Sequence, residues 1–137
     1  MNTVGIDFGT GNTVLSYWKT DELKVFSVEG EMCIPSDVLV NKDGNILLDH
    51  RLVNNPPIGY QRIFGIKREL LDCNSTKQHS LNMLINYASK RILYLYDLFS
   101  RENPQNVKQT VLTCPAHASS AYRALLLEIG RKAGLEE

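Results

Sequence analysis

The chain has 137 residues, 43% of them hydrophobic, which is enough for one domain with a buried core. Fifteen basic and fifteen acidic side chains give a formal net charge of zero, which argues against a polybasic surface for nucleic acid or membranes. No window approaches the roughly 18 consecutive apolar residues of a membrane span, and the N-terminus lacks the pattern of a secretory signal. These features predict a cytoplasmic protein.

The cysteines and histidines indicate no metal centre. Cys33, Cys73 and Cys114 lie far apart without C-x-x-C spacing, so we expect reduced thiols. The three histidines are equally scattered, and no cluster of metal ligands is visible.

The first half of the chain predicts short strands. Residues 3–8 alternate, with Val4, Ile6 and Phe8 on one face and Gly5 and Asp7 on the other. Residues 13–18 and 23–28 follow as β-branched and aromatic strands. Two further strands are expected at 37–40 and 45–48, joined by an Asp-Gly hairpin. Residues 54–59 read as a loop, and 60–71 are ambiguous, with a short helical turn.

The second half predicts helix, strand and helix. Apolar residues recur every three or four positions from Leu81 to Phe99, with Ser80 as N-cap. Residues 110–115 predict a short strand, and 119–133 a second helix closed by Gly134. The order predicts an α/β fold whose mixed sheet combines a three-stranded meander with a strand between two helices.

The turn "GTGN", residues 9–12, separates the first two predicted strands. Its glycines allow a ligand to approach the backbone, its N–H groups could surround an anion, and Thr10 and Thr13 add hydroxyl donors. Asp7 beside a phosphate would require Mg²⁺ between the two anions. An ordinary hairpin turn explains the same residues and is favoured by the turn alone. The sequence has neither a Walker loop nor a dinucleotide-binding fingerprint.

Several motifs together resemble the actin-like ATPase superfamily, and particularly its seventy-kilodalton heat-shock chaperones. "GIDFGTGNT" is similar to that family's first phosphate motif, "IPSDVLV" to its Thr-Pro-Ser segment and "FGIKREL" to its Phe-Ala-Ile-Lys-Arg-Leu stretch. "VLTCPAHASSAYRALLLEIGRKAGLEE" matches its Thr-Val-Pro-Ala…Arg…Ala-Gly-Leu block without gaps. The resemblance spans nearly the whole chain and favours phosphate binding over a simple hairpin.

The resemblance also implies ligands and roles. It implies ATP or ADP with Mg²⁺, ordered by Asp7 through water, and places Lys67 near the γ-phosphate and attacking water. The β- and γ-phosphates would lie against Gly9, Thr10, Gly11 and Asn12. Pro115 and Arg123 match a pair that relays nucleotide state to a substrate domain. Gly11 replaces a threonine of the family, which removes a hydroxyl but keeps the backbone donor.

The same resemblance sets an expected domain plan. Residues 1–32 and 80–137 would form an incomplete ribonuclease-H-like core of the first lobe, and 33–79 an inserted smaller subdomain carrying Lys67. The family's second lobe, with its adenosine pocket and second phosphate loop, has no counterpart here, and the end of the chain indicates a piece of a domain or a truncated gene. We therefore expect weak ATP binding without turnover, and an exposed sheet edge that favours association.

Three functional interpretations remain open at this stage. The first is the N-terminal part of a chaperone ATPase domain involved in stress response, with co-chaperones or client proteins as partners of a full-length form. The second is a truncated or divergent regulatory or interaction module that does not hydrolyse ATP. The third is part of a sugar or acid kinase of the superfamily, although the "CPAH…AGLEE" block argues against it.

Overall fold

The computed structural model describes residues 3–72, 79–104 and 107–135, and Cys73 therefore lies outside the described residues. A main sheet contains β1 (Thr3–Phe8), β2 (Asn12–Lys19), β3 (Glu22–Val25) and β8 (Gln109–Leu112) in the order β3-β2-β1-β8. β1 and β8 run parallel, whereas the β1–β2 and β2–β3 pairs are antiparallel. The predicted mixed sheet is confirmed.

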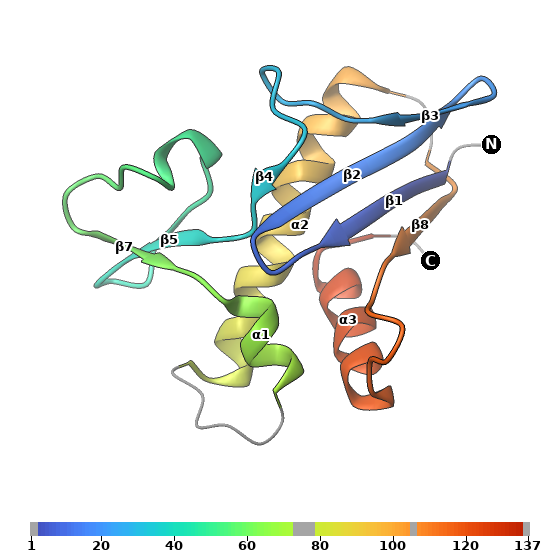
Figure 1. Ribbon diagram of the computed structural model, residues 1–137. Helices are drawn as coiled ribbons and strands as arrows, with labels where there is room; N and C mark the ends of the chain where they lie inside the picture. The colour runs from blue at the N-terminus through green and yellow to red at the C-terminus, as the bar shows by residue number, and fades with distance from the viewer. Residues whose placement is uncertain (1–2, 73–78, 105–106, 136–137) are drawn as a thin grey trace.

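A smaller antiparallel sheet lies beside the main one (Figure 1). It contains β6 (Ile46–Leu47), β5 (Val38–Asn41) and β7 (Tyr60–Ile63), in that order. The short strand β4 (Ile34–Pro35) pairs with the start of β2 and leads directly toward β5. The predicted Asp-Gly hairpin is confirmed between β5 and β6, where Gly44 takes a φ of +81°. A short 3₁₀ helix, His50–Leu52, separates β6 from β7.

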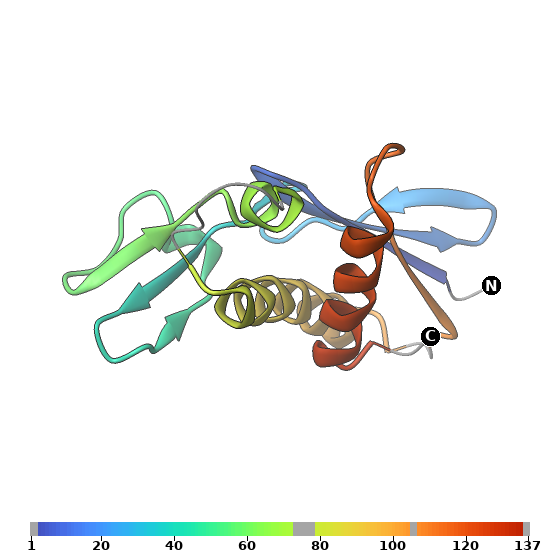
Figure 2. The same cartoon turned by 90° about the horizontal axis from the view of Figure 1, so that it is seen from below.

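The described residues form three α-helices: α1 (Ile66–Leu71), α2 (Leu81–Glu102) and α3 (Ser120–Lys132). Figure 2 shows α2 and α3 on one side of the main sheet. The Ser80 hydroxyl caps α2 by accepting from the N–H of Met83, as predicted. At the end of α3, Gly134 has a φ of +74°, and the N–H of Leu135 donates to the Gly130 carbonyl, which closes the helix.

The alternation in β1 places its apolar residues in the core. Val4, Ile6 and Phe8 are buried beneath the helices, whereas Asp7 is exposed on the opposite face, as predicted. One hydrophobic cluster connects the main sheet with residues of the small sheet and of α1, among them Val38, Ile63 and Ile66. The two sheets therefore share a continuous core.

Several predicted boundaries differ from the structure. β3 ends at Val25 instead of residue 28, β8 ends at Leu112 instead of 115, and α2 continues beyond Phe99 to Glu102. Residues 60–63 form strand β7, which was not predicted, while the expected helical turn is α1. Only Ile63 of β7 is buried, so its sequence carries no alternating pattern.

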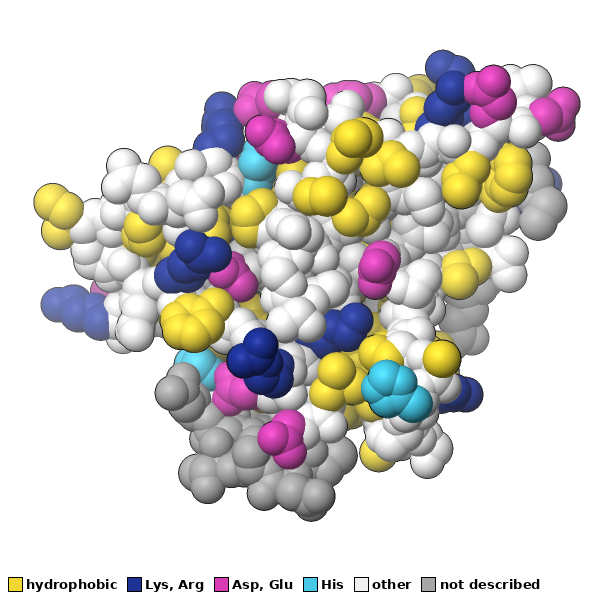
Figure 3. Space-filling view, in the orientation of Figure 1, with side chains coloured by type: hydrophobic (Ala, Val, Ile, Leu, Met, Phe, Trp, Pro, Cys, Tyr) yellow, Lys and Arg dark blue, Asp and Glu magenta, His cyan; other side chains and the backbone are white. Residues whose placement is uncertain are grey.

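None of the helices that the structure describes covers the outer face of the main sheet (Figure 2). Residues paired across neighbouring strands point to the same side of a sheet, and the register places Trp18, Leu23, Val25 and Val111 on the side of Gly5, away from the buried face. All four side chains are exposed. Figure 3 shows hydrophobic side chains gathered on this face.

Candidate phosphate-binding site

The β1–β2 turn presents backbone donors that the fold does not use. The Gly9 N–H donates to the Asn12 carbonyl at 2.8 Å and closes the turn. The N–H groups of Thr10 and Gly11 have no acceptor among the described residues. Consecutive free N–H groups in a turn form the concave surface that binds anions in many proteins. The predicted turn thus has the donors that a phosphate needs.

The two glycines of this turn meet different constraints. A Cβ on Gly9 would overlap the carbonyl oxygen of Asn12, so the turn excludes any side chain there. A Cβ on Gly11 would meet nothing within 4 Å, and the backbone at Gly11 has no positive φ. Gly9 is therefore required by the turn, whereas the Gly11 position has room for a larger residue.

The prediction that Thr13 offers its hydroxyl to a ligand is wrong. Thr13 is fully buried, and its Oγ1 lies 2.9 Å from Oγ of Ser36, which is also buried. A buried hydroxyl that already has a partner inside the protein cannot face a ligand on the surface. Thr10, in contrast, is exposed at the tip of the turn and remains available.

Ser36 holds the turn from behind. It lies between β4 and β5, and its Oγ donates to the Gly9 carbonyl at 2.8 Å. Its backbone N–H donates to the Gly11 carbonyl at 2.9 Å. Two of the turn's carbonyl groups are therefore engaged by a single buried residue.

Asp7 lies at the edge of the turn with its carboxylate exposed. Thr113, which follows β8, donates from Oγ1 to Asp7 Oδ1 at 2.8 Å, and its N–H donates to the Ile6 carbonyl at 3.1 Å. The other carboxylate oxygen has no protein partner in the described part of the chain. No group of three or more His, Cys, Asp or Glu side chains that could hold a metal was found there. A Mg²⁺ ion at Asp7 would thus depend on water and phosphate oxygens, which suits this cation.

A buried tyrosine lies behind this carboxylate. Tyr122 of α3 is 1% exposed, and its hydroxyl has no hydrogen-bond partner among the described residues. Burial raises the pKa of Tyr122 to about 12, with smaller contributions from Cys114 and Asp7. The hydroxyl therefore stays protonated at neutral pH.

Lys67 is placed on α1, whose buried residues Ile66 and Leu70 fix the helix in the core. α1 lies next to the β1–β2 turn in both orientations (Figures 1 and 2). Lys67 as a whole residue is 9% exposed, yet its side chain has no hydrogen bond or ion pair with another described residue. Largely buried lysines usually have an anionic partner. A lysine without a partner, next to a turn whose N–H groups are free, is suited to bind an anionic ligand.

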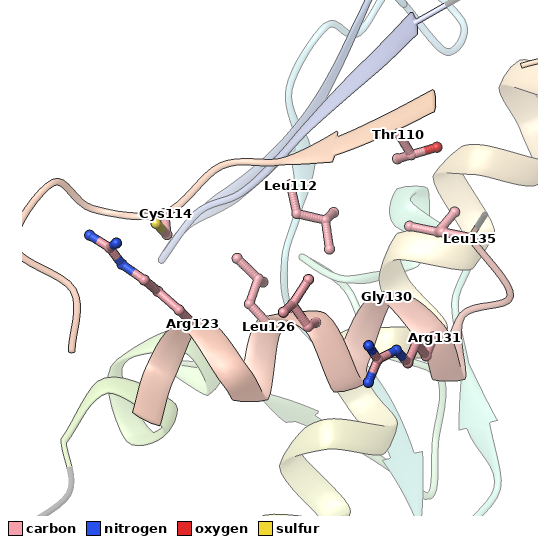
Figure 4. Close-up of a pocket in the computed structure, with 9 residues that line it drawn as sticks. Thr110, Leu112, Cys114, Arg123, Leu126, Gly130, Arg131 and Leu135 are labelled. Atoms are coloured by element: carbon pink, nitrogen blue, oxygen red, sulfur yellow. The ribbon is translucent and has the colours of Figure 1, made fainter. Parts of the chain in front are cut away.

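Pro115 lies in the loop that follows β8, and Arg123 lies on α3. The Pro115 carbonyl accepts from the N–H of Ala118 in the turn before α3, and Arg123 is exposed on the first part of that helix. No hydrogen bond joins the two residues in the described part of the chain. Arg123 instead stands at one end of a pocket of about 260 Å³ between β8 and α3, with Leu112 and Leu126 on its walls (Figure 4). This pocket includes no residue of the turn.

Two residues of the site were not assigned a role from the sequence. Ser36 lies in the "IPSD" segment and Thr113 in "VLTCP", and both segments resemble motifs of the family without assigning a role to either residue. Each reaches its partner across a large sequence separation, 27 residues for Ser36 to Gly9 and 106 for Thr113 to Asp7. Spacing along the chain gives no signal for such contacts.

Comparison with known proteins identifies distant relatives. No family model matches the chain. The chaperone protein DnaK of Thermosipho africanus is 32% identical over 137 residues, and DnaK of Thermotoga neapolitana 30% over 146, each alignment covering 97% of this chain and 23% of the relative. A chaperone protein HscA homolog of Rickettsia prowazekii is 25% identical over 154 residues, covering 97% and 25%. The chain is thus distantly similar to seventy-kilodalton heat-shock chaperones and spans about a quarter of their length.

Proposed function

We propose that this chain forms the first phosphate-binding wall of an ATP-binding domain of the kind found in seventy-kilodalton heat-shock chaperones. The observation that carries the proposal is the β1–β2 turn, whose Thr10 and Gly11 N–H groups are free and whose Gly9 excludes a side chain. The similarity to DnaK and HscA over almost the whole chain supports the same conclusion.

Each residue of the site has a chemical task in this proposal. The turn from Gly9 to Asn12 would bind the β- and γ-phosphates through its N–H groups. Asp7 would hold Mg²⁺ through water, and this ion would neutralise phosphate charge. Lys67 would place its ammonium near the γ-phosphate, where a cation stabilises the charge that develops during phosphoryl transfer.

The domain plan and the relay pair belong to the same proposal. Residues 1–32 and 80–137 would be the core of the first lobe, with residues 33–79 inserted into it. Pro115 and Arg123 would relay nucleotide state to a second domain of a longer protein. Hydrolysis, co-chaperones and client proteins would likewise belong to that protein, and the chain by itself would bind ATP weakly without turnover.

Titration with Mg·ATP, followed by amide signals in nuclear magnetic resonance spectra, tests this function. We expect the largest shifts at Thr10 and Gly11, because their free N–H groups would bind the phosphates. Asp7→Ala and Lys67→Ala should each weaken binding about tenfold, since each removes a charge from the site.

Asp43→Ala is the matched control, because Asp43 is an exposed aspartate in the β5–β6 turn. Its affinity for Mg·ATP should equal that of the wild type. Equal affinity in the Asp7 and Lys67 variants, or no shift at the turn with millimolar nucleotide, would contradict the proposed site. Binding without phosphate release is the result expected of this chain, whereas measurable phosphate release would contradict the expectation of no turnover.

A further inference from the structure

The contacts of Ser36 determine where the N–H groups of the turn point. A trans peptide unit is planar, and its C=O and N–H bonds point in opposite directions. The Gly9 carbonyl, which accepts from Ser36 Oγ, shares a peptide unit with the Thr10 N–H. The Gly11 carbonyl, which accepts from the Ser36 N–H, shares one with the Asn12 N–H. By holding both carbonyls, Ser36 directs both N–H groups to the opposite side of the turn.

The hydroxyl contacts form a chain with a defined direction. Ser36 Oγ has a single hydrogen, which it donates to the Gly9 carbonyl. In the 2.9 Å contact between the two hydroxyls, Ser36 must therefore accept and Thr13 must donate. Both side chains are buried, so water does not compete for these bonds. Thr13 thus fixes the orientation of the hydroxyl that in turn fixes Gly9.

Ser36 is anchored in turn by its neighbour Asp37. The Asp37 carboxylate accepts from Arg62 Nε of β7, and the Asp37 carbonyl accepts from the guanidinium of Arg91 on α2. Asp37 is itself buried. The segment that holds the turn is therefore attached to the small sheet and to the longest helix, and its position does not depend on the turn.

We propose that Ser36 is the positioning residue of the phosphate turn: its two hydrogen bonds hold the Gly9 and Gly11 carbonyls and so direct the free Thr10 N–H group toward the bound phosphate. This inference rests on the proposed function for its ligand. The direction in which Ser36 holds the peptide units of the turn is a property of the protein without ligand. Ser36 touches no nucleotide, and its hydroxyl acts only through the Gly9 peptide unit.

The variants Ser36→Ala and Thr13→Val test this role, with Ser89→Ala as the control. Ser89 is a buried serine whose hydroxyl donates only to the Asn86 carbonyl within α2. With the amide signals of Thr10 and Gly11 as readout, Ser36→Ala should weaken Mg·ATP binding about tenfold. Thr13→Val leaves the Ser36 hydroxyl in place and should weaken binding about threefold. Ser89→Ala should bind like the wild type.

Hydrogen exchange of the Gly9 amide provides a measurement without ligand. This N–H closes the turn by donating to Asn12, so its exchange reports whether the turn keeps its shape. In Ser36→Ala, the ratio of the Gly9 amide exchange rate to that of Leu15 in β2 should rise about tenfold. In Ser89→Ala the same ratio should be unchanged. Thr13→Val should show an intermediate ratio and serves as the test if Ser36→Ala does not fold.

The two measurements separate the two proposals. Unchanged Gly9 exchange in the folded variant would overturn the role of Ser36, whatever the chain binds. Faster exchange with no Mg·ATP binding by the wild type would retain Ser36 as the residue that shapes the turn and would contradict the proposed function. Equal nucleotide affinity for the wild type and Ser36→Ala would overturn the inference while leaving the proposed function intact.

Discussion

Gly9 and Gly11 are equivalent in the sequence but not in the folded turn. Replacing Gly9 with alanine should destabilise the protein by about 1–3 kcal/mol, because the added Cβ would overlap the Asn12 carbonyl. Gly11→Ala should change the free energy of unfolding by less than about 0.5 kcal/mol, since its Cβ would occupy open space. Urea denaturation measures both. Equal losses in the two variants would show that the turn does not have this shape.

Tyr122 links the stability of the protein to alkaline pH. Burial raises its pKa from 10.0 to about 12, so the folded state keeps the proton more tightly than the unfolded state does. The resulting stability is fully present below pH 10 and is lost as the pH rises toward 12. Tyr122→Phe should remove this part of the pH dependence, as measured by urea denaturation at pH 7 and pH 11.

The same variant should also be neutral or slightly stabilising at pH 7. The Tyr122 hydroxyl is buried without a described partner, and removing an unsatisfied polar group removes its desolvation cost of about 1 kcal/mol or more. Tyr60→Phe, at the half-buried start of β7, is the control. A large loss of stability in Tyr122→Phe at pH 7 would indicate that the hydroxyl has a partner.

At the residue scale the sequence predicted part of the site. The strand alternation correctly placed Asp7 on the outer face, and the glycine pattern correctly located the turn. It could not distinguish Thr10 from Thr13, because only the fold shows which hydroxyl is buried. The roles of Ser36 and Thr113 arise from contacts between distant segments, and small hydroxyl residues are too common for their presence to indicate such contacts.

Arg91 joins α2 to the segments that precede β5 and follow β6 in the small sheet. Its guanidinium donates to the Asp37 and Leu48 carbonyls, and it lies over the Tyr94 ring at 5.2 Å. Burial lowers the pKa of Arg91 to about 10, which still leaves it charged at pH 7. Within the described part of the chain Arg91 forms no salt bridge, so this fully buried cation is held by carbonyl dipoles and a ring face.

Arg91→Ala should destabilise the chain by about 2–4 kcal/mol, because two charge-assisted hydrogen bonds are lost and two carbonyls lose their partner. Lys90→Ala, at the neighbouring exposed position of the same helix, controls for changes in helix propensity. Thermal and urea unfolding measure the difference between the two. Similar stabilities would contradict the structural role assigned to Arg91.

Elements differed in how far their sequence predicted them. α2 and α3 were predicted well because their buried residues recur at helical spacing and serines cap both N-termini. β3 was predicted too long because Phe26 and Val28 are buried beyond its end, which extended the apolar pattern without extending the strand. β7 was missed because its pairing with β5, rather than its own pattern, makes it a strand.

The whole molecule should unfold as one unit. The two sheets share a single cluster of buried side chains, and α2, with 22 residues and a length of about 33 Å, contributes to that cluster along much of its length. Calorimetry should therefore give one transition with a calorimetric enthalpy close to the van't Hoff enthalpy. Two separate transitions would show that residues 33–79 fold independently of the remainder.

At this scale the described helices show one further property. None is long and apolar enough to cross a membrane, among the residues that the structure describes. The mixed sheet followed from the predicted element order, whereas the pairing of β8 with β1 and the continuity of the core across both sheets did not. The resemblance implies that residues 33–79 are an insertion, but the sequence contains no signal for the contacts that Arg91 and Ile66 make across its boundaries.

The uncovered face of the main sheet carries the chain's single tryptophan. Because Trp18 is 51% exposed in the folded state, its fluorescence should lie near that of an unfolded chain and should report poorly on folding. The same exposure makes it a sensitive label for contact. Any molecule or segment that covers the outer face would transfer the indole from water to an apolar environment and shift its emission to shorter wavelength. The chain thus contains its own optical probe for occupancy of that face.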